Sequence, residues 1–473
     1  MSPEARWTRP LTVDETGTPE LLGAKAHGLV GLMRLGSPVP AAFVVTTEAC
    51  RAFLDSGVFP PGLDAELDLA LARLESVTGR TFGDPGPGSG PVRALTVSVR
   101  SGASVSMPGM MDTVLGLGTG SDPGEEVRAA IRSVFASWHT PRARTYRTLH
   151  GIPHDLGTAV VVQAMVDGDR DEHSGAGVAF GRDPNSGASG PYGEVLFGSR
   201  GDAVVSGGRR TLPLDDLAHR EPGVWADLTR ALTLIEKDLR DTCYVEFTFE
   251  SGRLWLLQAR PGRFTGAAAV RVAVDLVDEG TLTRREALLR VTPAHLGRAR
   301  VPRVVPPPGV EPLARGIGAV PGVVTGRAAT TCEAAVRMAA EGPVVLVRPE
   351  TSPMDMSGLA AAAGVVTERG GPASHAAVVA RSLGRPAVVG VGAHTLTDGD
   401  LVTVDGTAGL VVAGRSEVTT EAALPHLRRL LIWADEVSGE DPDLPEVERL
   451  RAAHRVLDRH RPETLRTPLR PKC

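Results

Sequence analysis

A histidine that follows a pair of glycines has the clearest chemical role in this sequence. His375 lies in the segment GGPASHAAVVAR (370–381), directly before an apolar run. Ser374 suits the N-cap of a helix over this run, which would place His375 in the first turn. There the unpaired backbone N–H groups favour negative charge and disfavour imidazolium, so we expect a neutral, nucleophilic ring. The alternative is a histidine that only begins a helix, but its neighbours favour a carrier of a phosphoryl group.

Lysine is rare in this chain, which directs attention to each position where it occurs. Of 51 basic residues only Lys25, Lys237 and Lys472 are lysine. Lys25 lies in a small-residue segment before the amphipathic stretch GLVGLMRLG, where a compact ammonium could reach a phosphate in a way that a planar guanidinium would not. The alternative is a solvated surface lysine, which is the interpretation we give to the other two.

Two further groups of residues suit a nucleotide. Arg100 ends the strand-like SVRSG (98–102) before the glycine-rich SMPGMMDT (106–113), which could bring a guanidinium and backbone amides to a polyphosphate. Glu246, Gln258 and Arg260 lie on two apolar segments joined by a turn at 250–253, so we expect a hairpin that presents all three on one face. Oxygen ligands beside a cation suit a Mg²⁺–phosphate site, and the alternative is an ordinary hairpin with a polar outer face.

The elements that must position these residues alternate between strand-like and helix-like patterns. Apolar runs predict strands at 159–162, 254–257, 344–347, 388–389 and 402–404, and amphipathic periodicity predicts helices at 63–74 and 226–239. A proline-rich segment, VPRVVPPPGVEP, breaks all periodicity and predicts a stiff, extended linker. The predicted organisation is therefore a first domain over 1–300, a linker over 301–312, a compact valine-rich domain over 313–415 and a charged helical tail over 416–473.

Composition excludes several classes of function. The formal net charge of −5 and the pI near 6.2 argue against an electrostatically driven nucleic-acid or membrane binder. No apolar run approaches the ~18 residues of a membrane span, and the N-terminus lacks the apolar region of a secretory signal. The four cysteines are far apart, which suggests neither a zinc site nor a disulfide framework. We therefore expect a soluble cytoplasmic protein.

Taken together, these motifs resemble the pyruvate phosphate dikinase family over nearly the whole length of the chain. The resemblance implies an α/β (α+β) fold, with an ATP-grasp nucleotide-binding domain followed by a swivelling β/β/α phosphohistidine domain. The segments that carry it are LLGAKAHGLVGLMRLGSPVPAAFVVTTEAC (21–50), SVRSGASVSMPGMMDTVLGLG (98–118), SWHTPRARTYRTLHGIPHDLGTAVVVQAMV (137–166), SGAGVAFGRDP (174–184), VEFTFESGRLWLLQAR (245–260) and GGPASHAAVVAR.

The resemblance also implies a role for each site residue and the cofactors ATP and Mg²⁺. His375 would be the phosphoryl carrier, with Arg100 and Arg260 assisting catalysis. In the family, ATP pyrophosphorylates the histidine, inorganic phosphate takes one phosphoryl group, and the phosphohistidine converts pyruvate to phosphoenolpyruvate. The implied phosphate ligands are Lys25, Arg100 and Arg260, the metal and nucleotide ligands are Glu246 and Gln258, and the adenine pocket is lined by Gln163, Met165 and Val166.

The sequence also departs from the family pattern. Tyr244 stands where the family has an aspartate, Ala373 replaces a threonine that takes a regulatory phosphate in some relatives, and residues 200–202 read RGD in place of Gln-Gly-Glu. A helical insertion that carries an arginine of the phosphate site is missing between the SMPGMM loop (106–111) and SWHTPRA (137–143). The barrel that binds pyruvate and phosphoenolpyruvate in the family would begin soon after Trp433.

Three functions remain open. The first is an enzyme that phosphorylates its own His375, while a separate domain or protein with the phosphoenolpyruvate barrel supplies the acceptor. The second is a regulatory paralogue that binds nucleotide without turnover, which Tyr244 and the missing insertion favour. The third is a small-molecule phosphotransferase with a different acceptor domain. The joint presence of the phosphate, metal and carrier residues favours the enzyme.

Overall fold

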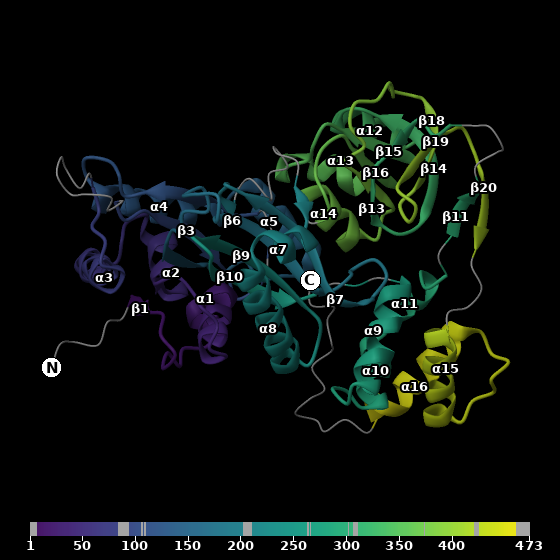
Figure 1. Cartoon of the computed structure of the whole chain (residues 1–473), viewed down its shortest axis with the longest axis horizontal. Helices are drawn as coiled ribbons and strands as arrows, with labels where there is room; N and C mark the ends of the chain where they lie inside the picture. The colour runs from purple at the N-terminus through teal and green to yellow at the C-terminus, as the bar shows by residue number, and fades with distance from the viewer. Residues whose placement is uncertain are drawn as a thin grey trace. The chain divides into compact units, whose positions relative to one another are not determined.

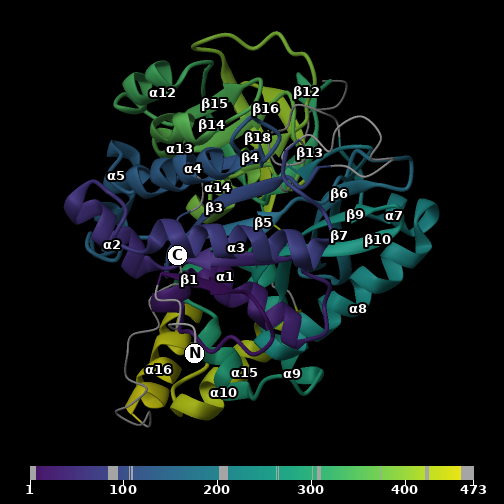
Figure 2. The ribbon, with the colours of Figure 1, turned by 90° about the vertical axis from the view of Figure 1, so that its left-hand side faces the viewer.

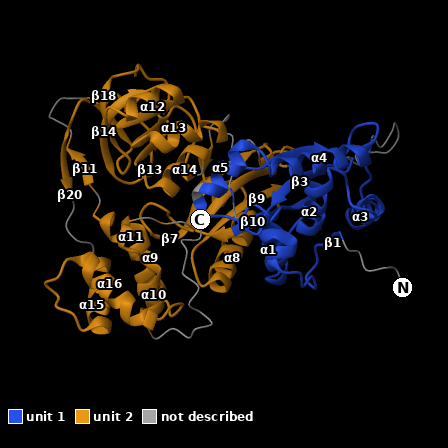
Figure 3. Cartoon of the chain, turned by 180° about the vertical axis from the view of Figure 1, so that it is seen from behind, with its two compact units in different colours: residues 1–167, 254–259, 469–473 blue, residues 168–253, 260–468 orange. Residues whose placement is uncertain are grey.

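The chain, whose elements are labelled in Figure 1, divides into two compact units in this computed structural model (Figure 3). Unit 1 comprises residues 1–167, 254–259 and 469–473, and unit 2 comprises residues 168–253 and 260–468. The structure describes residues 7–83, 94–105, 107, 110–201, 211–262, 264, 266–300, 302–305, 311–372, 374–420 and 425–459. None of the helices in these ranges has both the length and the apolar character that crossing a membrane requires.

Unit 1 is built on a five-stranded sheet with the order β1-β2-β5-β3-β4. The central strand β5 is buried along its whole length, and its alternate residues Val160 and Val162 enter a core shared with α2, α3 and α4. The predicted strand at 159–162 and the predicted helix at 63–74 are confirmed as β5 and α3. The strands are β1 (Thr8–Pro10), β2 (Ala42–Val45), β3 (Val97–Gly102), β4 (Thr113–Leu117) and β5 (Ala159–Ala164). The helices are α1 (Pro19–Arg34), α2 (Thr47–Ser56), α3 (Leu63–Thr78), α4 (Pro123–Ser137) and α5 (Pro141–His150).

Unit 2 begins with β6 to β9 of a second five-stranded sheet, whose strand order is β10-β9-β6-β7-β8. Residues 254–259 of β10 are assigned to unit 1. Helix α8 packs on β6 and β9, where Cys243 Sγ lies 3.7 Å from the Leu232 carbonyl oxygen. The predicted helix at 226–239 and the predicted strand at 254–257 are confirmed as parts of α8 and β10. The elements are β6 (Gly175–Arg182), β7 (Ser189–Phe197), β8 (Leu212–Pro213), α7 (Asp215–Arg220), α8 (Pro222–Leu239), β9 (Cys243–Glu250) and β10 (Arg253–Pro261).

The third sheet has eight strands in the order β12-β19-β18-β14-β15-β16-β17-β13. Its centre, β14 to β17, is parallel, and both faces are covered, so β15 is a continuous apolar run. Val344 and Leu346 enter one core with α12 and α14, while Val345 and Val347 enter the other. The strands are β12 (Ala314–Arg315), β13 (Ile317–Val320), β14 (Val323–Ala329), β15 (Val344–Arg348), β16 (Gly364–Thr367), β17 (Ala387–Val389), β18 (Leu401–Asp405) and β19 (Leu410–Ala413); the helices are α12 (Cys332–Ala339), α13 (Met356–Ala361), α14 (His375–Leu383) and the 3₁₀ helix η1 (Pro353–Asp355).

Helices from two distant parts of the sequence form one cluster in unit 2. Figure 2 shows α15 and α16 in yellow beside α9 and α10 in teal. Leu288 of α10, Leu430 of α15 and Leu450 of α16 are buried in the same core. The last part of the predicted first domain therefore shares its core with the predicted helical tail. The helices are α9 (Gly266–Asp278), α10 (Arg284–Arg290), α11 (Pro293–Gly297), α15 (Pro425–Ser438) and α16 (Glu446–Arg459).

The proline-rich linker contains a strand in its described part. β11 (Pro302–Val305) pairs antiparallel with β20 (Glu417–Thr420), and Val304 N donates to Asp405 Oδ2 at 2.8 Å. The prediction of a helical tail is wrong at 417–420, because this segment contains the β-branched residues Val418 and Thr419 and pairs with β11, where Val418 lies opposite Val304. The chain therefore enters and leaves the eight-stranded domain through a two-stranded ribbon.

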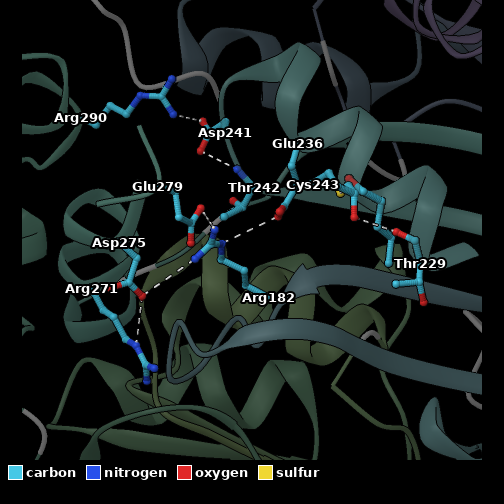
Figure 4. A network of polar contacts seen from close by, with 12 residues as sticks. Arg182, Thr229, Glu236, Asp241, Thr242, Cys243, Arg271, Asp275, Glu279 and Arg290 are labelled. Carbon is cyan, nitrogen blue, oxygen red and sulfur yellow. Dashed lines mark hydrogen bonds and ion pairs between the residues drawn. The ribbon is translucent and has the colours of Figure 1, made fainter. Parts of the chain in front are cut away.

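A buried arginine joins the second sheet to the helical cluster (Figure 4). The Arg182 side chain at the end of β6 is 3% exposed and donates to Glu279 Oε2 of α9 at 2.6 Å. Its guanidinium also lies 3.9 Å from Glu236 Oε1 of α8 and 3.9 Å from Asp275 Oδ2 of α9. Burial raises the pKa of Glu236, and the positive charge of Arg182 opposes this shift. The network fixes α9 against the sheet that carries β6.

Candidate functional site

His375 occupies the first turn of α14, as the sequence predicts. The side chain of Ser374 is the N-cap and accepts a hydrogen bond from Ala377 N at 3.5 Å. Pro372 and Gly371 precede this cap and are buried, while His375 is half-buried. The short polar side chain of Ser374 thus sets both the start of the helix and the direction in which the histidine leaves it.

The ring of His375 is held by a threonine that the sequence analysis did not select. Thr351 Oγ1 lies 3.1 Å from His375 Nδ1, and Thr351 follows β15 at the carboxyl end of a parallel strand. In the tautomer that carries the proton on Nδ1, the ring donates to Thr351 and keeps its lone pair on Nε2. In that tautomer the contact leaves Nε2 as the nucleophilic atom.

Burial lowers the pKa of His375, and the nearby Asp355 carboxylate opposes this shift. The expectation of a neutral ring is thus supported, with burial as the main cause. Asp355 is itself almost buried, accepts hydrogen bonds from Ser352 N at 2.8 Å and Ser352 Oγ at 3.0 Å, and lies 3.3 Å from Arg348 Nε. The spacing of Ser352 and Asp355 is that of a capping box, a pattern that could have identified this segment from the sequence.

One face of the second sheet carries the residues expected to contact metal and phosphate in unit 2. Residues directly opposite each other in an antiparallel pair project to the same face. Tyr244 pairs with Phe180, and Glu246 pairs with Val178, which in turn pairs with Glu194. Tyr244 and Glu246 therefore share a face with Glu194, on the side of the sheet that α8 does not cover.

The loop before His375 and α14 lie against this same face within unit 2. Arg381 of α14 has its guanidinium 5.9 Å from the Phe180 ring. Glu194 lies so close to Gly371 that a Cβ on this glycine would be 1.5 Å from Glu194 Oε1. Glu194 is buried and accepts from Thr211 Oγ1 at 2.7 Å. The absence of a side chain at Gly371 therefore allows the loop to approach the sheet.

Arg260 at the end of β10 stacks on an aromatic ring. Its Cζ lies 4.3 Å from the centroid of Tyr244. Tyr244 is 4% exposed, and its ring contacts Phe180 edge-on at a centroid distance of 5.0 Å. β9 and β10 are consecutive strands and neighbours in the sheet, so the predicted hairpin is confirmed. In unit 2 the structure thus places Arg260 on the ring of Tyr244, which shares its sheet face with Glu246.

Lys25 in unit 1 is positioned by a glycine that interrupts α1. Gly23 has a φ of 76°, and a Cβ there would lie 1.5 Å from the Gly102 carbonyl oxygen. Ala24 N donates to the Ala103 carbonyl at 3.0 Å. The close approach of these two backbones places Lys25 beside the end of β3, the strand that carries Arg100.

Arg100 contacts the strand segment that carries Gln258, also in unit 1. Arg100 Nη1 donates to the Leu257 carbonyl oxygen at 3.5 Å. Arg100, Lys25 and Gln258 are each half-buried, so part of each side chain reaches solvent. Unit 1 therefore brings two predicted phosphate ligands close together and places one of them against the strand of a predicted metal ligand.

The residues expected at the adenine differ in accessibility. Gln163 is 2% exposed, and its Nε2 donates to the Pro40 carbonyl at 3.3 Å, so its side chain stabilises the packing of β5. Met165 and Val166 are half-buried. Met165 N donates to the Thr96 carbonyl at 2.8 Å, and Met165 Sδ accepts from Gly116 N at 3.1 Å. Met165 and Val166 therefore have accessible surface for a base, whereas Gln163 has almost none.

Several segments quoted in the sequence analysis lie outside the described residues. These are residues 106, 108 and 109 of the glycine-rich loop, Asp202, Ala373, residues 301 and 306–310 of the proline-rich linker, and residues 421–424 and 460–473 of the predicted tail, which include Lys472. In the ranges that the structure describes, no three histidine, cysteine, aspartate or glutamate side chains gather as they would around a metal ion.

The two parts of the chain match two sequence families. Residues 59–222 match the AMP/ATP-binding domain of pyruvate phosphate dikinase, and residues 340–409 match the mobile domain of PEP-utilising enzymes. The molecule is thus a nucleotide-binding protein with a mobile domain, and His375 lies in that domain. The chain belongs to the pyruvate phosphate dikinase family. The predicted α/β fold class and the predicted family are confirmed.

Curated relatives cover almost all of the chain. Pyruvate, phosphate dikinase of Rhizobium meliloti (strain 1021) is 34% identical over 526 residues, which include 88% of this chain and 58% of the relative. The Zea mays protein pyruvate, phosphate dikinase 2 is 34% identical over 88% of this chain and 58% of its own length. The Clostridium symbiosum pyruvate, phosphate dikinase is 33% identical over 91% of this chain and 60% of its own length. The chain therefore spans less than two thirds of these relatives.

Proposed function

We propose that this protein is an ATP-dependent phosphotransferase that phosphorylates its own His375 and passes the phosphoryl group to pyruvate or another acceptor. The acceptor would be bound by a separate domain or protein. The observation that carries this proposal is the position of α14 against the sheet face that holds Glu246 and Tyr244. A carrier histidine in a mobile domain and a metal-binding carboxylate are thereby parts of one compact unit.

Five side chains are the proposed ligands of the phosphates and the metal. Lys25, Arg100 and Arg260 would contact phosphate oxygens, because fixed cations stabilise the charge that develops during phosphoryl transfer. Glu246 and Gln258 would hold Mg²⁺, which when bound neutralises charge on the phosphates. Met165 and Val166 would line the adenine pocket, and Gln163 would position them.

His375 is the proposed nucleophile. Its Nε2 lone pair would form a bond to the β-phosphorus of ATP while the bond from this phosphorus to the AMP oxygen breaks, and AMP would leave. Inorganic phosphate would then accept the terminal phosphoryl group, and a phosphohistidine would remain. Thr351 would hold the proton on Nδ1 during attack, and burial would keep the ring unprotonated before it.

Labelling at the β-phosphoryl group of ATP tests the proposal. In the presence of Mg²⁺ we expect an acid-labile, base-stable adduct that is absent in His375→Asn. Arg260→Ala and Glu246→Ala should each slow labelling on the order of 10²–10³-fold, as loss of a preorganised charge typically does. Equal labelling of His375→Asn and the wild type would refute the role of His375 as the phosphoryl carrier. Normal labelling rates in the other two variants would mean that Arg260 and Glu246 have only structural roles.

The acceptor is tested separately. The described residues form sheets of five, five, two and eight strands, and none of these sheets repeats a strand–helix unit eight times, as a pyruvate-binding barrel of this family would. We expect the purified chain to form phosphohistidine but to make no phosphoenolpyruvate from pyruvate, ATP and phosphate. Addition of a separately expressed phosphoenolpyruvate barrel should restore the complete reaction. Phosphoenolpyruvate formed by the purified chain alone would refute a separate acceptor.

A further inference from the structure

An aromatic pair links the phosphate-binding arginine to the helix of the carrier histidine. Tyr244 lies beneath Arg260, with 4.3 Å between the guanidinium carbon and the ring centroid. Phe180 packs edge-on against Tyr244 at 5.0 Å, and its own ring lies 5.9 Å from the guanidinium of Arg381 in α14. All four residues belong to unit 2, and both rings are buried. Two arginines from different elements therefore lie over one pair of rings.

The stacking contact with Tyr244 restricts the conformation of the Arg260 side chain, which the position of its backbone in β10 alone does not do. Arg260 is the last residue but one of β10, and an arginine has several rotatable bonds that are free at a strand end. A ring that is 4% exposed cannot rotate freely, and Phe180 fixes the plane of this ring from the edge. The stacked guanidinium keeps its N–H groups at its periphery, where they can bind an anion while its face is occupied.

The side chain of Arg381, which lies over the other ring of the pair, is equally constrained. Arg381 Nη2 donates to the Ala319 carbonyl at 2.9 Å and to the Pro372 carbonyl at 3.2 Å, which ties it to the loop before His375. Burial lowers the pKa of Arg381 to about 10, and the charge of Tyr192 would oppose this shift. A guanidinium with this pKa remains charged at neutral pH, and the face of Phe180 lies within the distance of a cation–π contact.

We propose that Tyr244 is a positioning residue for histidine phosphorylation. It holds the guanidinium of Arg260 over the sheet face on which α14 docks. Phe180 fixes the ring of Tyr244 from one side and contacts Arg381 of α14 on the other. The inference rests on the proposed function, since the phosphoryl group that Arg260 would contact is the one that His375 accepts. It assigns a role to the aromatic face of Tyr244 and none to its hydroxyl group.

Three variants test this role in the full-length protein with β-labelled ATP and Mg²⁺. Tyr244→Leu removes the aromatic face and should lower the rate of His375 labelling about 2- to 30-fold, which corresponds to a cation–π energy of about 0.5–2 kcal/mol. Tyr244→Phe keeps the face and should restore most of the rate. Phe197→Leu is the matched control, because Arg220 stacks on Phe197 at 3.6 Å in the same sheet and outside the proposed site. Its labelling rate should remain close to that of the wild type.

A double-mutant cycle separates positioning from a loss of stability. If Tyr244 acts through Arg260, Tyr244→Leu should have almost no further effect on labelling in an Arg260→Met background. Independent, multiplicative losses in the double variant would overturn the inference, as would a Tyr244→Leu rate equal to that of the wild type. A wild-type protein without any label on His375 would instead refute the proposed function, so the two failures can be distinguished.

Discussion

Replacing Thr351 by valine should slow phosphorylation of His375 without weakening the binding of ATP. Valine has nearly the shape of threonine but lacks the oxygen that lies 3.1 Å from His375 Nδ1. A hydrogen bond of this kind contributes about 0.5–1.5 kcal/mol net, which corresponds to about a 2- to 13-fold lower rate when only the reacting tautomer benefits. Because His375 is half-buried, water can replace part of the lost bond, and we expect the effect to stay within this range.

The assay is single-turnover labelling of His375 with β-labelled ATP at several ATP concentrations. The rate at saturating ATP should fall, the half-saturating concentration should not change, and Thr351→Ser should recover the rate because serine retains the hydroxyl group. Nitrogen NMR of labelled His375 should show a larger share of the Nε2-protonated tautomer in Thr351→Val. A wild-type rate together with an unchanged tautomer ratio would refute the role of this contact.

Three further predictions follow from the contacts in each unit. Labelling should decline only below pH 6.5, because burial lowers the pKa of His375. The variant Asp355→Asn removes the charge that opposes this shift, so it should move the decline to still lower pH. An NMR titration of the His375 ring would measure this change. Over the same pH range folding stability should fall with pH, since the unfolded ring takes up a proton first. Arg182→Met should lower the free energy of unfolding by about 3–5 kcal/mol. Arg271 is half-exposed, so Arg271→Met should lower it by only about 0–1 kcal/mol. Equal denaturant midpoints of the two variants would contradict this prediction. Gly23→Ala should destabilise unit 1 by at least about 1–3 kcal/mol and impair labelling, because its φ is 76° and its Cβ would meet Gly102, while Gly31→Ala, with open space around it, should be neutral or stabilising in the same melt.

The part of the site that depends on local pattern was predictable from the sequence. Ser374 and His375 are neighbours, and a short polar residue before an apolar helical run is sufficient to predict the cap and the first turn. The turn between β9 and β10 is also local, which is why the hairpin that carries Glu246 and Arg260 could be predicted. The roles of these residues in catalysis stay predictions.

The contacts between distant segments could not be predicted in the same way. Thr351 precedes His375 by 24 residues, and it reaches the ring only because β15 and β16 are parallel neighbours. The amphipathic pattern of α15 and α16 indicates that one side is buried, but it does not say that α9 and α10 are the partners. Periodicity determines which face of an element is buried, whereas the identity of its partner depends on the whole chain.

The docking of α14 on the second sheet uses contacts that suit a reversible encounter. The hydrogen bonds of Arg381 go to Ala319 and Pro372, both within its own domain, while the sheet offers it the face of Phe180. Contacts with an aromatic face have little directionality, so their separation does not leave a specific buried hydrogen bond unmade. A direct hydrogen bond that does cross is the one from Asn185 Nδ2 to the Gly318 carbonyl at 2.9 Å, and Asn185 is half-buried, so water can replace this bond. A carrier domain that must reach a donor and then an acceptor requires a docking surface of this kind. Shape and charge determine where the domain binds, and few strong hydrogen bonds oppose its dissociation.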